Sequence, residues 1–191
     1  MIPTPEECFQ RMQQYGMLAH IKNHSIVVAR IAEYLASELN AADGESFSLP
    51  LTVAAALLHD IGKTQCLENG NDHAQLGKEI CLTHRYTELA PIVGEPVVLK
   101  NGMPGCSLSE KEIVYYADKR VNHDVIVSLE ERLAYIMERY GNNDEHRHRA
   151  IERNFVTCHQ IEEKIFAGLS ISPAAIGGAL EDFHSLLLQV A

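Results

Sequence analysis

Residues 59–63 read His-Asp-Ile-Gly-Lys and follow an apolar run that begins at Leu51. Neutral imidazole and carboxylate are both ligands for divalent transition metals and, with more carboxylate, for magnesium. The glycine lets the backbone turn, and the lysine offers a positive charge to a nearby anion. The pentapeptide therefore predicts a metal site that acts on phosphate.

Two further potential ligands lie on predicted helices. His24 belongs to the apolar face of a helix expected over about residues 20–39, where apolar side chains recur at three- and four-residue steps. Asp118 lies on a helix that opens with the capping box Ser109–Glu112. A lone polar side chain on such a face is costly to bury without a partner.

Each of these residues also has a structural interpretation. His24 could be a hydrogen-bonded core histidine, and Asp118 could pair with Lys119 or Arg120. A shared divalent cation would satisfy the whole set at once. We therefore predict four metal ligands: His24, His59, Asp60 and Asp118.

The rest of the chain is also typical of helices, and strand-like alternation is scarce. We predict an all-α fold, a helical bundle of about seven to nine helices forming a single domain over 1–191. Its motif-bearing core covers about 20–140, and C-terminal helices within 144–191 pack on it. The helices are expected at these places: from Pro50 to Gly62, after Asp72 as a cap, near 88–93, after Ser109 as a cap, from Ser128 to Gly141, over 144–167 and over 173–190. A lid-like loop is expected over 95–107.

Composition narrows the classes of function. The chain has 191 residues, a net charge of −10 and a pI of about 5.4, so we do not expect a nucleic-acid partner. We interpret the basic cluster 145–149 as a solvated helix face. With no apolar membrane span or export signal, we expect a soluble cytoplasmic protein, for which a homodimer stays open. Five scattered cysteines suggest reduced thiols.

The order His24, His59-Asp60, Asp118 resembles the HD superfamily of metal-dependent phosphohydrolases, in the branch that carries His-Asp-Ile-Gly. The match covers about residues 20–140 and includes His24-Ser-Ile-Val-Val-Ala and Tyr116-Ala-Asp-Lys119. The resemblance implies an all-helical domain whose four ligands hold Mn, Fe, Co, Ni or Mg, with open positions for water and phosphate.

A second metal site is left open by the resemblance. His73 matches the first additional histidine of two-metal members, so it is either a second metal ligand or a substrate contact. Where relatives often have another histidine, this chain has Pro96. We interpret His84 as a surface residue, and His123-Asp124 as the end of a helix.

The predicted activity is that of a divalent-metal-dependent phosphohydrolase, which cleaves a phosphate ester of a nucleotide or another small phosphorylated molecule through a metal-activated water. Asp60 and Lys63 are the predicted catalytic residues, and Lys63 and Lys119 the predicted phosphate ligands. Arg132 and Arg139 are weaker phosphate candidates, for which we favour solvated or salt-bridged surface roles. The alternative is a non-hydrolytic, metal-containing module that senses a nucleotide.

Overall fold

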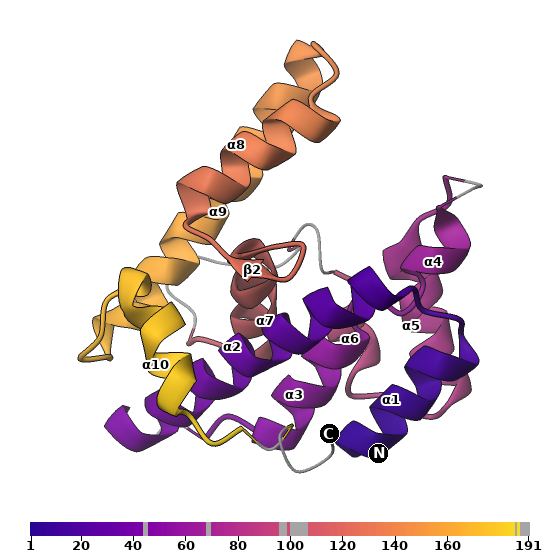
Figure 1. Cartoon of the computed structure of the whole chain (residues 1–191), viewed down its shortest axis with the longest axis horizontal. Helices are drawn as coiled ribbons and strands as arrows, with labels where there is room; N and C mark the ends of the chain where they lie inside the picture. Colours follow the sequence, from indigo (N-terminus) through magenta and orange to yellow (C-terminus); the bar gives the residue numbers. More distant parts are fainter. Residues whose placement is uncertain (44–45, 68–69, 96–98, 100–106, 186, 188–191) are drawn as a thin grey trace.

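The computed structural model describes residues 1–43, 46–67, 70–95, 99, 107–185 and 187. Helices make up nearly all of the regular structure in these residues (Figure 1). The elements are α1 (Pro5–Gln14), α2 (Ala19–Asp43), α3 (Leu49–Leu58), α4 (Lys63–Cys66), α5 (His73–Thr83), α6 (Ala90–Val93), α7 (Glu110–Lys119), β1 (Val121–Asn122), β2 (Val125–Ile126), α8 (Leu129–Tyr140), α9 (Glu145–Ala167), the 3-10 turn η1 (Pro173–Ala175) and α10 (Ile176–Asp182).

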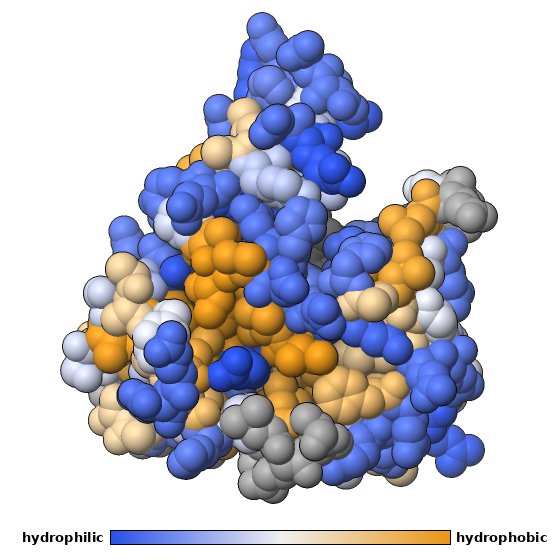
Figure 2. Space-filling model, viewed as in Figure 1, coloured by the Kyte–Doolittle hydropathy of each residue, from blue (hydrophilic) through white to orange (hydrophobic). Residues whose placement is uncertain are grey.

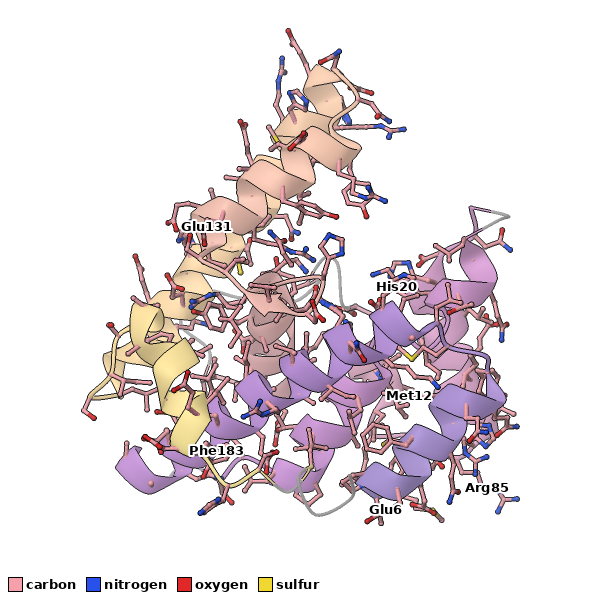
Figure 3. All side chains as sticks on the ribbon, viewed as in Figure 1. Glu6, Met12, His20, Arg85, Glu131 and Phe183 are labelled. Carbon is pink, nitrogen blue, oxygen red and sulfur yellow. The ribbon has the colours of Figure 1, made fainter. Side chains whose placement is uncertain are left out.

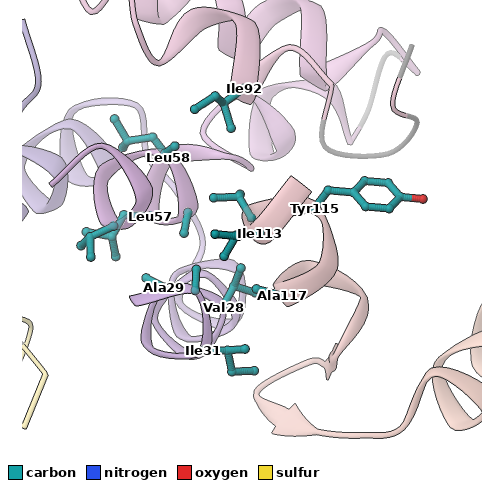
Figure 4. Close-up of a cluster of buried hydrophobic side chains, with 14 of the residues drawn as sticks. Val28, Ala29, Ile31, Leu57, Leu58, Ile92, Ile113, Tyr115 and Ala117 are labelled. Carbon is teal, nitrogen blue, oxygen red and sulfur yellow. The ribbon is translucent and has the colours of Figure 1, made fainter. Parts of the chain in front are cut away.

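This arrangement confirms the all-α prediction. Eight helices of the described part have seven or more residues, within the expected number. The core forms where α2, α3 and α7 pack against one another, and Figure 4 shows Val28 of α2 near Ile113 of α7 in this cluster, to which Leu57 of α3 also belongs. These three helices also carry or immediately precede the predicted ligands.

Local sequence explains where these helices begin. Ser48, Asp72, Ser109 and Ser128 each accept a hydrogen bond from a backbone N–H in the first turn of the helix that follows, as predicted for the last three. Residues 52–58 of α3 are all buried, so this helix crosses the interior and delivers its C-terminal end there.

Two predicted boundaries are wrong. The helix expected over 173–190 ends at Asp182, because Phe183 adopts an extended conformation (Figure 3) and packs edge-to-face against Tyr34, while Ser185 donates a hydrogen bond to buried Glu33. The helix expected to reach Gly62 ends at Leu58. Phe183 and Ser185 are therefore held by side-chain contacts with α2 rather than by continuation of the helix.

The C-terminal helices contact the motif-bearing part. Lys164 of α9 lies 3.1 Å from Glu112 of α7, and the Arg120 guanidinium donates to the Pro173 carbonyl. The extent of the domain stays a prediction. Cys8, Cys66, Cys81 and Cys158 are free thiols in the described residues, and Cys106 lies outside them.

The far end of the hairpin formed by α8 and α9 projects from the body of the molecule, whereas α9 also packs against α7 (Figure 1). Figure 2 shows the surface hollowed between this hairpin and α4–α5, with hydrophilic residues around the hollow and an apolar area over β2 and α2. Within the described residues, no helix is long and apolar enough to cross a membrane.

Candidate metal centre

His24 and Asp118 face each other across the contact between α2 and α7. The Nε2 atom of His24 lies 3.0 Å from the Asp118 Oδ1 atom, and both side chains are buried. The other ring nitrogen of His24, Nδ1, lies 2.8 Å from the carbonyl oxygen of His123. A carbonyl accepts a hydrogen bond, so Nδ1 carries a proton, and Nε2 is the ring nitrogen that would bind a cation.

His59 and Asp60 occupy the turn directly after α3. The Nδ1 atom of His59 donates to the Ala56 carbonyl at 2.7 Å, which again leaves Nε2 for a ligand. That Nε2 atom is buried and has no hydrogen-bond partner; it lies 3.5 Å from Asp60 Oδ2 and 3.6 Å from Asp118 Oδ1. A buried nitrogen of this kind needs a partner, and a cation between these atoms would supply it.

The ligand atoms of His24, His59 and Asp60 all lie within 4.8 Å of one another, so the group could hold a metal ion. Asp118 joins them through its distances to the two histidines. The residues therefore fit a divalent cation with mixed nitrogen and oxygen ligands. The structure brings together all four side chains that the sequence predicts as ligands, although their separations in the chain are large.

The electrostatics of the cluster favour ionised carboxylates. Burial alone would raise the pKa of Asp60, but His59 and Lys63 outweigh it and hold the pKa well below its ordinary range. Lys119 and His24 do the same for Asp118. Burial alone would lower the pKa of His59, yet the carboxylates of Asp60 and Asp118 raise it to about 10. A metal ion that binds His59 would therefore displace a proton.

Lys63 and His73 lie on the α4–α5 side of the cluster. Lys63 Nζ is 2.7 Å from Asp60 Oδ2, and 38% of its side chain is exposed. His73 Nε2 is 3.6 Å from Asp60 Oδ1, and burial lowers its pKa, which favours the neutral ligand form. Both predicted residues are therefore beside Asp60, and His73 retains both of its predicted roles.

Asp118 has two basic neighbours, Lys119 and Arg132, and the side chains of both are largely enclosed. Lys119 Nζ is 2.6 Å from Asp118 Oδ2, with only 4% of its side chain exposed. Since Lys119 is enclosed and already paired, it is better placed to fix Asp118 than to meet a substrate. Arg132, expected on the surface, is 13% exposed and has Nη2 3.9 Å from Asp118 Oδ1. Arg132 is therefore partly enclosed and ion-paired with Asp118 rather than solvated.

The sequence interpretation also missed the role of His123. His123 lies in the turn between β1 and β2, not at a helix end, and its φ of 55° is in the left-handed region. That conformation is uncommon for a residue other than glycine. It directs the His123 carbonyl to His24, so the turn fixes the orientation of a ligand. One feature of the sequence could have indicated this turn: the segment between the two capped helices that contain Asp118 and Arg132 is short, so its backbone must lie close to both.

Gly62 has a different role from the one predicted. Its φ of −83° is ordinary for any residue, so the turn does not require glycine. Instead, a Cβ atom at Gly62 would lie 2.6 Å from the His73 carbonyl oxygen and 3.0 Å from the Gly77 nitrogen. The glycine therefore allows the backbone after Asp60 to contact α5, which brings His73 to the cluster.

Other predicted residues do not join the cluster. His84 lies at the end of α5, where it contacts Tyr15 and stacks on Tyr86. Arg139 is exposed, as expected. Pro96 and most of the predicted lid over 95–107 lie outside the described residues.

This fold and this buried cluster define an all-α protein with a candidate site for a divalent metal. The chain belongs to the HD domain family, whose model matches residues 21–122. That span contains His24, His59, Asp60 and Asp118.

Three relatives illustrate the similarity. Ribonuclease Y 1 of Pediococcus pentosaceus is 46% identical over 81 residues, 41% of this chain and 13% of the relative. An uncharacterized protein of Clostridium beijerinckii is 32% identical over 108 residues, 52% of this chain and 63% of that protein. A tRNA (cytidine(56)-2'-O)-methyltransferase of Picrophilus torridus is 30% identical over 162 residues, 76% of this chain and 43% of the enzyme.

The chain thus spans less than two thirds of the length of each of these relatives. No solved structure matches it at a significant level.

Proposed function

We propose that this protein is a divalent-metal-dependent phosphohydrolase that cleaves a phosphate ester of a nucleotide or another small phosphorylated molecule. The observation that carries the proposal is the Nε2 atom of His59, which is buried without a hydrogen-bond partner and points at two carboxylates. A site that only stabilised the fold would satisfy this atom with a protein partner.

In this proposal His24, His59, Asp60 and Asp118 hold the metal. A divalent cation bound there would lower the pKa of a water molecule and polarise a phosphoryl oxygen. The second carboxylate oxygen of Asp60 orients the attacking water as a hydrogen-bond acceptor, because the low pKa of Asp60 keeps it ionised at neutral pH. Lys63, which is partly exposed beside Asp60, stabilises negative charge on the phosphoryl oxygens.

The names of the relatives guide the choice of substrates. Two of the three bear names of enzymes that act on RNA, although their matches cover only parts of those proteins. A substrate panel for this chain should therefore contain short oligoribonucleotides and cyclic nucleotides beside mononucleotides and sugar phosphates.

The test combines metal analysis with that panel. Protein purified without chelator is analysed for its elements and assayed with the metal it contains, together with Asp60→Ala and the matched control Asp182→Ala, which removes an exposed carboxylate from α10. We expect hydrolysis of at least one ester by wild type and Asp182→Ala, and its loss in Asp60→Ala and after chelation. Hydrolysis that survives both treatments would contradict the proposal, and tight nucleotide binding without turnover would favour the sensing alternative.

A further inference from the structure

Arg132 at the start of α8 has more hydrogen-bond donors than partners. Its Nη1 atom donates to Asn122 Oδ1 at 2.8 Å, and its guanidinium lies over the Tyr135 ring, 5.8 Å from the centroid. The Nε atom is buried and has no hydrogen-bond partner. Since a guanidinium has five N–H donors in a planar fork, most of them are left for a ligand that the protein itself does not provide.

Support of Asp118 does not explain this arginine. The Nη2 atom lies 3.9 Å from Asp118 Oδ1, which is beyond hydrogen-bonding distance. Both oxygens of Asp118 already have closer partners, Lys119 at 2.6 Å and His24 at 3.0 Å. Asn122 and Tyr135 hold the guanidinium beside the cluster while leaving its Nε edge without a protein acceptor.

A tetrahedral oxyanion is the ligand that suits such a group. Phosphoryl oxygens accept two parallel N–H donors from a guanidinium, and these charge-assisted bonds are stronger than those between neutral groups. Arg132 touches the Asp118 side of the cluster, whereas Lys63 touches the Asp60 side. The two cations come from α8 and α4, which flank the hollow shown in Figure 2.

We propose that Arg132 binds a phosphoryl oxygen of the substrate and, with Lys63, clamps the phosphate group over the metal cluster. This inference rests on the proposed function and identifies Arg132 as a further substrate-binding residue. It also assigns α8 to the active site, although that helix lies outside the matched family region of residues 21–122.

The test measures binding of inorganic phosphate by calorimetry to protein loaded with its own metal. Arg132→Met should raise the dissociation constant by about tenfold or more, as expected when charge-assisted hydrogen bonds are lost. Arg132→Lys keeps the positive charge but lacks the planar fork of donors, so its dissociation constant for phosphate should lie between those of wild type and Arg132→Met. Arg139→Met is the matched control, because it removes an exposed arginine from the same helix, and it should bind phosphate like wild type. Metal content and circular dichroism are measured for every variant.

Three outcomes would overturn the inference: wild type that does not bind phosphate, Arg132→Met that binds it as tightly as Arg139→Met, or Arg132→Met that loses metal and phosphate together. The last result would make Arg132 a residue that positions Asp118. If hydrolysis depends on Asp60 but phosphate binding does not depend on Arg132, this inference is refuted and the proposed function is not. Phosphate binding through Arg132 in a protein that hydrolyses nothing supports it and counts against the proposed hydrolysis.

Discussion

Replacement of Gly62 by alanine tests how the segment after His59 and Asp60 is held against α5. The added Cβ would lie 2.6 Å from the His73 carbonyl oxygen, 3.0 Å from the Gly77 nitrogen and 3.1 Å from the Leu76 Cβ atom. The first two are backbone atoms, so no side-chain rotation relieves the contacts. Ordinary contact begins near 3.4 Å, so the turn and the start of α5 must separate by about 0.8 Å.

Such overpacking costs about 1–3 kcal/mol of unfolding free energy. It has a functional consequence as well, because α5 begins at His73, whose Nε2 atom lies 3.6 Å from Asp60 Oδ1. We therefore expect Gly62→Ala to lose stability and to weaken whatever His73 contributes at the cluster.

The assay is urea unfolding in the presence of chelator, so that metal binding does not contribute to the difference. Gly178→Ala is the control, because an added Cβ at this helical glycine of α10 meets no atom within 4 Å. It should leave stability unchanged or raise it by up to about 1 kcal/mol, as alanine is the better helix former. If Gly62→Ala is as stable as Gly178→Ala, the close approach of the two backbones is refuted.

Two further predictions concern the ligands themselves. His123→Gly should retain metal, because His24 needs only the backbone carbonyl of residue 123, and glycine readily adopts the left-handed φ of 55°. His123→Val should retain less metal, because a β-branched residue strains that conformation by about 1–3 kcal/mol. Elemental analysis compares the two variants, and equal metal contents would contradict this role of the turn. In chelated protein, the unfolding free energy should fall as pH rises from 6.5 towards about 10, because Asp60 and Asp118 raise the pKa of His59 above its ordinary value and stabilise its protonated form. Urea unfolding across this range checks it, with His59→Gln as the reference that lacks the titrating group, and an identical pH profile in both proteins would argue against the interaction.

The sequence singled out four side chains that the fold brings together, because the chemistry of each conflicts with its surroundings. His24 lies on an apolar helical face, and His59-Asp60 ends a buried run, so each position shows a polar residue where an apolar one would be expected. Helix starts were predictable for the same local reason, since Asp72 and Ser128 cap the helices that follow them.

The features that were missed depend on contacts between distant segments. Gly62 looks like a helix terminator in sequence, but its close approach to α5 exists only after folding. The Pro173–Val190 pattern continues a helical period, yet Phe183 leaves the helix to pack on Tyr34. Arg132 has the spacing of a surface residue, and its proximity to Asp118 appears only in the folded chain. Periodicity describes one helix at a time and therefore cannot report such contacts.

The charges around the cluster are compatible with the phosphate substrate that we propose for this acidic chain. Two buried carboxylates, Asp60 and Asp118, are in contact with three cations, Lys63, Lys119 and Arg132. These three cations exceed the carboxylates by one, and a divalent ion that displaced the proton of His59 would raise this local excess to three. At a distance the net charge of −10 repels a phosphate ester, whereas within the hollow the local charges attract it. Added salt should therefore screen the distant repulsion from exposed charges more than the attraction inside the partly buried site. Moderate salt should weaken phosphate binding less at this site than at a fully exposed cationic patch.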